Sequence, residues 1–219
     1  MKRFVLSLIN LILAGAMLLI LICPIASFNK VVGDAELKEG QNASSLYFVE
    51  SLFVSEEDVL KASADLFAKS TELALEFSGD EYEEKLYNSP EKNRFDVYQF
   101  ATSETLIAHG FTSDSGNLIV QTKAISALII AYLACAALTV LITLICMIFN
   151  NKKLKGLGTF FTLIAFLISV ALALTIEFAL KLDGAITSLV SHVKWPLYVF
   201  IGFTFIYMLI RSALNRKTN

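Results

Sequence analysis

The fold is decided by the opening stretch, MKRFVLSLINLILAGAMLLILICPIASF, residues 1–28. Within it, Phe4 to Ile22 is a run of 19 residues that is apolar apart from Ser7 and Asn10. A signal-peptide core is about 7–15 residues long and precedes a small-x-small cleavage site, which this stretch lacks. A helix of about 20 residues rises about 30 Å, the thickness of the hydrocarbon core of a bilayer. We therefore expect residues 1–27 to form an uncleaved transmembrane anchor.

Three further apolar blocks follow, and each reaches or approaches the ~20 residues needed to cross a membrane. They are Ala124 to Phe149, Leu157 to Leu180 and Trp195 to Ile210. Hydrophobic residues make up 56% of the 219-residue chain, against ~45–50% in soluble domains. The sequence predicts an all-α membrane protein, with a four-helix transmembrane bundle and a small, mainly helical extracytoplasmic domain between spans 1 and 2.

Basic residues gather in three clusters that fall on one side of a four-span chain. The clusters are Lys2 with Arg3, then Lys152, Lys153 and Lys155, then Arg211, Arg216 and Lys217. Short loops rich in Lys and Arg stay in the cytoplasm. We therefore expect a multi-pass protein of the cell membrane with cytoplasmic N- and C-termini, and with residues 28–123 and 181–194 outside.

The long external segment, residues 28–123, is acidic. It holds 18 of the 20 Asp and Glu residues and only eight Lys or Arg. Such a surface repels nucleic acid and favours cationic partners or metal ions. A charged, solvated face is the simpler interpretation of the same pattern.

Part of this segment has helical periodicity. Ser55 is a suitable N-cap for residues 55–77, and Pro90 suits the first turn of a helix over residues 89–109. The intervening stretch, residues 79–88, is expected to link the two helices into an antiparallel hairpin. Its predicted core is Leu66, Leu73, Phe77, Phe95, Tyr98 and Leu106, with Leu60, Phe67 and Ala74 widening the first apolar stripe. The predicted domains are residues 1–27 (first anchor), 28–123 (acidic helical domain) and 124–219 (three-span region).

Small residues recur every four positions on two of the spans, which lets helices approach closely. They are Ala127, Ala131, Cys135, Thr139 and Thr143 on the second span, and Ala165, Ser169 and Ala173 on the third. The three cysteines, Cys23, Cys135 and Cys146, lie in or beside spans, so the sequence offers no disulfide framework or zinc cluster outside. We predict no metal or cofactor site. Asn42 begins an Asn-Ala-Ser glycosylation triplet, whose use depends on the source.

Glu177 is the ionisable residue inside a predicted span, so it is a candidate for function. An interfacial helical pair with Lys181, four residues on, is the simpler explanation. His109 and His192 are both expected outside and can act as general bases near neutral pH. Together with Glu177 they would form an acid–base cluster if the fold brought them together, but no catalytic motif accompanies them.

Two classes of function remain open from the sequence. The first is a non-enzymatic envelope protein, an accessory, sensor or partner-binding protein, whose extracytoplasmic domain binds a membrane or extracytoplasmic protein. The second is a membrane-embedded enzyme catalysing acyl transfer or hydrolysis at the outer surface, or a small transporter, that uses His109, Glu177 and His192. Convergence of these three side chains on one cavity would distinguish the second class. We expect the first class, with the lipid bilayer as a further partner.

Overall fold

The computed structural model describes residues 2–32, 35–37, 43–101, 115–149, 151–178, 181–183 and 187–217. The chain forms two compact units. Unit 1 comprises Met1–Cys23, Leu128–Ala173 and Trp195–Asn219, and unit 2 comprises Pro24–Ala127 and Leu174–Lys194.

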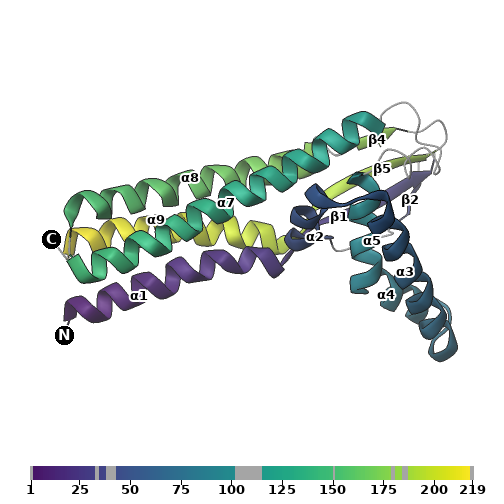
Figure 1. The fold of residues 1–219 in the computed structure, drawn as a ribbon, viewed down its shortest axis with the longest axis horizontal. Coiled ribbons are helices and arrows are strands. Elements are labelled where there is room, and N and C mark those ends of the chain that lie inside the picture. Colours follow the sequence, from purple (N-terminus) through teal and green to yellow (C-terminus); the bar gives the residue numbers. More distant parts are fainter. Residues whose placement is uncertain are drawn as a thin grey trace. The chain divides into compact units, whose positions relative to one another are not determined.

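Unit 1 is built from long helices that lie side by side (Figure 1). Its elements are α1 (Lys2–Ala16), the 3-10 helix η1 (Met17–Ile22), most of α7 (Ser115–Phe149), most of α8 (Lys152–Phe178) and α9 (Trp195–Lys217). Among the described residues, four stretches are long and apolar enough to cross a membrane: Phe4–Ile22, Val120–Phe149, Lys152–Phe178 and Trp195–Asn215. The chain is therefore a multi-pass membrane protein with a predominantly helical fold, as the sequence predicts.

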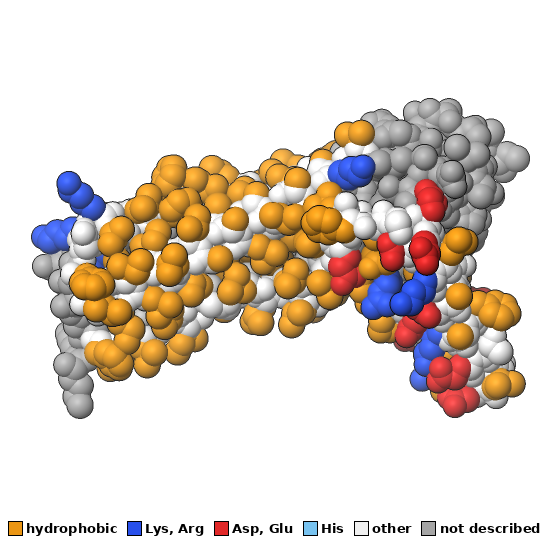
Figure 2. All heavy atoms as spheres, in the orientation of Figure 1, with side chains coloured by type: hydrophobic (Ala, Val, Ile, Leu, Met, Phe, Trp, Pro, Cys, Tyr) orange, Lys and Arg blue, Asp and Glu red, His pale blue; other side chains and the backbone are white. Residues whose placement is uncertain are grey.

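The outward faces of these helices are apolar. Large side chains such as Ile12, Leu19, Ile148 and Leu167 are exposed, and apolar side chains cover the helices of unit 1 in the space-filling view (Figure 2). A soluble protein rarely exposes so continuous an apolar surface. Lipid chains are the solvent that such a surface suits, and within lipid each helix satisfies its own backbone hydrogen bonds.

The interior of unit 1 contains most of the predicted small-residue ridges. Cys135, Thr139 and Thr143 are buried on α7, and Ala165, Ser169 and Ala173 are buried on α8, whereas Ala131 is half-buried and Ala127 is exposed. Buried hydroxyls donate to the carbonyl four residues earlier, Thr139 to Cys135 at 2.8 Å and Thr143 to Thr139 at 2.7 Å. These bonds satisfy polar groups that have no water to contact.

Unit 2 contains an antiparallel sheet that the sequence does not predict. Its strands are β1 (Pro24–Val32), β2 (Ala35–Leu37), β3 (Ala43–Ser44), β4 (Lys181–Asp183) and β5 (Thr187–Val193). The order is β2-β1-β5-β4, and β3 also pairs with β1. The longest pairing runs from Ala26 opposite Val193 to Val32 opposite Thr187. The sheet thus joins the segment after the first span to the segment before the last.

The helices of unit 2 follow in sequence between β3 and the first transmembrane part of α7. In the described part of this segment they are α2 (Ser45–Glu50), the 3-10 helix η2 (Ser51–Phe53), α3 (Glu56–Glu76), α4 (Asp80–Tyr87) and α5 (Pro90–Ala101). Ser55 caps α3 as predicted: its Oγ accepts from the Asp58 amide at 3.3 Å, and the Asp58 carboxylate accepts from the Ser55 amide at 2.8 Å.

The predicted linker over residues 79–88 lies between α3 and α5, and most of it is itself a helix, α4. This helix starts after Gly79, whose φ of 60° suits glycine. The predicted second helix begins as expected, but α5 ends at Ala101, and Leu106 lies outside the described residues.

The contacts between α3 and its neighbours differ from the predicted core. Val59, Ala62 and Leu73 are buried on α3, and Val97 is buried on α5, while Leu66, Phe77, Phe95 and Tyr98 are half-buried. The prediction that Leu60, Phe67 and Ala74 widen the buried stripe is wrong, because all three are exposed. Helix α5 packs against both α3 and α2. The Tyr98 hydroxyl donates to Glu50 at 2.7 Å, and the Arg94 guanidinium lies 5.6 Å from the Tyr47 ring centre.

Candidate functional site

Two of the three candidate catalytic residues lie together in unit 2. Oε1 of Glu177, at the end of α8, is 3.5 Å from Nδ1 of His192 in β5. Oε2 of Glu177 accepts the backbone N–H of Val193 at 3.0 Å. His109 lies outside the described residues. The predicted helical pair of Glu177 with Lys181 is wrong, because α8 ends at Phe178 and Lys181 belongs to strand β4.

The contacts of Glu177 and His192 are those of a structural link between α8 and β5. One carboxylate oxygen of Glu177 is held by a backbone amide of β5, and the other faces an imidazole of the same strand. More than a third of each side chain remains exposed, 36% for Glu177 and 40% for His192. The carboxylate therefore fixes the end of β5 to the end of α8. Catalysis by this pair stays a prediction.

A second group of polar side chains lies inside unit 1 and is called here the Arg211 cluster: Asn10, Thr143, Lys155, Tyr207, Arg211 and Asn215. Arg211 is 1% exposed, and its Nη1 donates to Thr143 Oγ1 at 2.8 Å and to the Tyr207 hydroxyl at 2.7 Å. The Tyr207 hydroxyl in turn donates to Oδ1 of Asn10 at 2.8 Å. The guanidinium thereby connects α9 with α7 and α1.

Gly158 of α8 provides the space for this guanidinium. A Cβ at position 158 would overlap Nη2 of Arg211 and stand 2.8 Å from its Cζ. Only glycine allows the side chain of Arg211 to lie directly against the backbone of α8.

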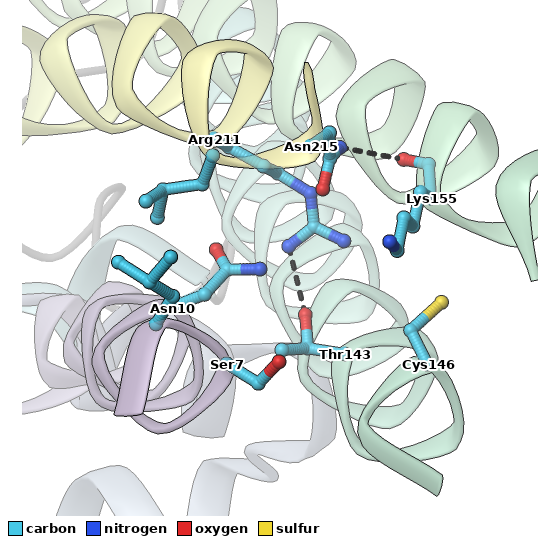
Figure 3. A pocket seen from close by; sticks show the side chains of 9 residues that line it. Ser7, Asn10, Thr143, Cys146, Lys155, Arg211 and Asn215 are labelled. Atoms are coloured by element: carbon cyan, nitrogen blue, oxygen red, sulfur yellow. Dashed lines mark hydrogen bonds between the residues drawn. The ribbon is translucent and has the colours of Figure 1, made fainter. Parts of the chain in front are cut away.

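Lys155 completes the cationic part of the cluster from the first turn of α8. It is 6% exposed. Asn215 of α9 donates from Nδ2 to the Lys155 carbonyl at 3.2 Å and to Thr159 Oγ1 at 3.0 Å, which fixes α9 to α8. Figure 3 shows the Arg211 and Lys155 side chains facing a common space, together with Asn10, Thr143 and Cys146.

The sequence contained a signal for this cluster. Thr204, Tyr207, Arg211 and Asn215 are spaced by three or four residues, so they form a polar stripe along an otherwise apolar span. From the sequence, Arg211 and Lys155 indicate only the topology, because spacing alone does not show whether a cation near the end of a span turns inward or reaches the interface.

A third feature is an exposed apolar stripe on α3, called the α3 stripe: Leu60, Ala64, Phe67, Thr71, Ala74 and Leu75. All six residues are exposed, and the largest are 71% (Leu60), 75% (Phe67) and 85% (Leu75) exposed. Their spacing places them on one face of the helix, away from the buried Leu73. Six acidic and two basic residues of α3 share the rest of its surface.

Comparison with protein-family models, with curated proteins and with solved structures gives no match for this chain. Functional conclusions therefore depend on the three features above.

Proposed function

We propose that this chain is a non-enzymatic protein of the cell membrane whose α3 stripe binds a protein partner outside the cytoplasm. The supporting observation is the exposure of Leu60, Phe67 and Leu75 on one helix. Single exposed apolar residues are common, but a continuous row on one helix face is typical of an interaction surface.

The charge around the stripe indicates what kind of partner would fit. α3 carries six acidic residues against two basic ones, and α4 carries four against one. Acidic side chains lie among apolar ones over the helices of unit 2 in Figure 2. The partner we propose is a protein with an apolar groove flanked by Lys or Arg, because opposite charges at the rim guide association. An anionic membrane surface would be repelled by the same charges.

The proposed orientation has cytoplasmic termini and residues 28–123 outside. The start of α1, the end of α7, the start of α8 and the end of α9 lie at one end of unit 1 (Figure 1), so the three basic clusters of the sequence belong to that end. Positive loops stay in the cytoplasm. In a cysteine-free background, an impermeant maleimide should label Lys61→Cys in intact cells and Lys152→Cys only after permeabilisation. Labelling of Lys152→Cys in intact cells would contradict this orientation.

A photocrosslinking amino acid at position 67 tests the proposed function, with position 65 on the charged face of α3 as the matched control. Both native side chains are exposed. We expect position 67, and not position 65, to crosslink one protein whose contact peptide is apolar with flanking Lys or Arg. Phe67→Ser should abolish co-purification of that protein. Crosslinks from position 67 to lipid or to a second copy of this chain would overturn the proposal.

The enzyme or transporter alternative keeps one supporting contact, the pairing of Glu177 with His192. It requires that His109 also reach this pair. A test is the growth or lipid phenotype of Glu177→Gln and His192→Gln strains, which should match the wild type if the function is partner binding.

A further inference from the structure

We propose that the Arg211 cluster binds one anionic phosphate group, supplied by a phospholipid headgroup or by free phosphate. The proposal concerns unit 1 alone and does not depend on the function proposed for the α3 stripe. It follows from the charge of unit 1, from the hydrogen-bonding capacity of Arg211 and from the place of the cluster along the spans.

The charge argument comes directly from the sequence of unit 1. This unit contains none of the chain's 20 acidic residues and eight of its 18 basic ones. Arg211 is buried, as is Lys155, and both side chains line the same cavity. A buried charge without a counter-charge costs several kcal/mol. Unit 1 has no Asp or Glu side chain that could supply a counter-charge to Arg211, so an anion bound from the solvent or the lipid would suit this site.

The hydrogen-bonding capacity of Arg211 leads to the same conclusion. A guanidinium has five N–H donors, and the bonds to Thr143 and Tyr207 both come from Nη1. Nε is buried and has no acceptor among the described residues. Arginine presents its donors as a planar fork that matches the oxygens of a phosphate. Nε of Arg211 is thus an unused donor in a fixed position.

The cavity beside these donors takes only a small group. Its volume is about 20 Å³, and it is lined by Arg211, Lys155, Asn10 and Ser7, with Leu6 and Leu214 among the other lining residues (Figure 3). This volume accepts a water-sized group, such as one phosphate oxygen, while the rest of the phosphate would stay at the half-exposed rim formed by Ser7, Leu214 and Asn215.

The Arg211 cluster lies close enough to the end of the last span for a phospholipid headgroup to reach it. Arg211 precedes Asn215, the last residue of the final span, by four positions, which is about 6 Å along a helix. The cluster also lies at the end of unit 1 where α8 begins and α9 ends (Figure 1). A phosphate at the membrane interface is therefore within reach of the guanidinium, and basic pockets of this kind between spans bind anionic headgroups.

The test measures binding to the purified full-length chain in a non-ionic detergent by native mass spectrometry. The probes are phosphatidylglycerol, phosphatidylcholine and inorganic phosphate. The variants are Arg211→Gln and Lys155→Gln, with Lys153→Gln as the matched control, because Lys153 belongs to the same basic turn but is exposed. Lys155→Gln keeps the test informative if Arg211→Gln fails to fold.

We expect one phosphatidylglycerol per chain, bound at least about tenfold more weakly by Lys155→Gln, a change of about 1.4 kcal/mol. Lys153→Gln should bind like the wild type, and phosphatidylcholine should bind weakly. Competition by millimolar inorganic phosphate would identify free phosphate as a ligand of the same site. Equal binding of phosphatidylglycerol by Lys155→Gln and Lys153→Gln, together with no binding of inorganic phosphate, would overturn the proposal. Neither result bears on crosslinking at position 67.

Discussion

Replacing Gly158 with alanine should destabilise unit 1 by displacing Arg211. The new Cβ would overlap Nη2, so the guanidinium has to move and lose its hydrogen bonds to Thr143 and Tyr207. A hydrogen bond to a charged group contributes about 1.5–3 kcal/mol. Alanine recovers about 1 kcal/mol through its higher helix propensity. The free energy of unfolding should therefore fall by about 2–5 kcal/mol.

Gly156→Ala is the matched control, because a Cβ at position 156 would meet nothing within 4 Å. The assay is thermal unfolding of the purified chain in detergent micelles, followed by circular dichroism. At about 2–4 °C per kcal/mol for a chain of this length, a loss of about 2–5 kcal/mol means that Gly158→Ala should lower Tm by roughly 4–20 °C. Gly156→Ala should leave Tm unchanged or raise it by about 2–4 °C. Equal Tm values for the two variants would show that the guanidinium does not lie against α8.

A double-mutant cycle assigns the cost to the correct contact. The same Cβ would stand 3.1 Å from Cγ2 of Ile142, which is a second possible source of destabilisation. In an Arg211→Met background, the cost of Gly158→Ala should fall below about 0.5 kcal/mol. A cost that persists in this background would place the clash at Ile142.

Three further predictions concern unit 2. Leu73 is 6% exposed, so Leu73→Ala should lower the free energy of unfolding by about 2–5 kcal/mol, whereas Leu75 is 85% exposed, and Leu75→Ala should change it by no more than about 0.5 kcal/mol. Limited proteolysis should cleave α3 faster in Leu73→Ala; equal cleavage rates in the two variants would refute this difference. Hydrogen bonds from Ser55 lower the pKa of Asp58 below its usual 3.8, so the stability from this cap is complete above that pH and is lost as the pH falls through the lowered pKa. Ser55→Ala should therefore destabilise α3 at pH 7 and lose this effect in acid, as measured by circular dichroism; a pH-independent difference would argue against the cap. Glu177→Ala should speed amide hydrogen exchange at Val193, because it removes the acceptor seen at 3.0 Å; unchanged exchange would mean that the sheet alone protects this amide.

The helices of unit 2 show how far a periodic pattern can be interpreted. The N-cap at Ser55 and the start of α5 at Pro90 follow from local chemistry, and both are found as predicted. Which of the two apolar faces of α3 is buried does not follow from the local sequence. The stripe of Leu60 and Phe67 is as regular as that of Val59 and Leu73, but only the second is buried, and α3 packs against α5 and α4. Periodicity identifies a face that could be buried, and the neighbouring helix decides which face is.

The sequence by itself determined the spans and the gathering of basic residues into three clusters. Both are local properties: about 20 apolar residues satisfy their own backbone hydrogen bonds as a helix in lipid wherever they occur in a chain. Tertiary structure alone decided the pairing of β1 with β5, because residues such as Ala26 and Val193 meet only after two distant segments come together. It also decided the position of Arg211, since the space beside Gly158 exists only once α8 and α9 are packed. An arginine near the end of the last span, which the sequence marks as a topology signal, thereby becomes a buried cation.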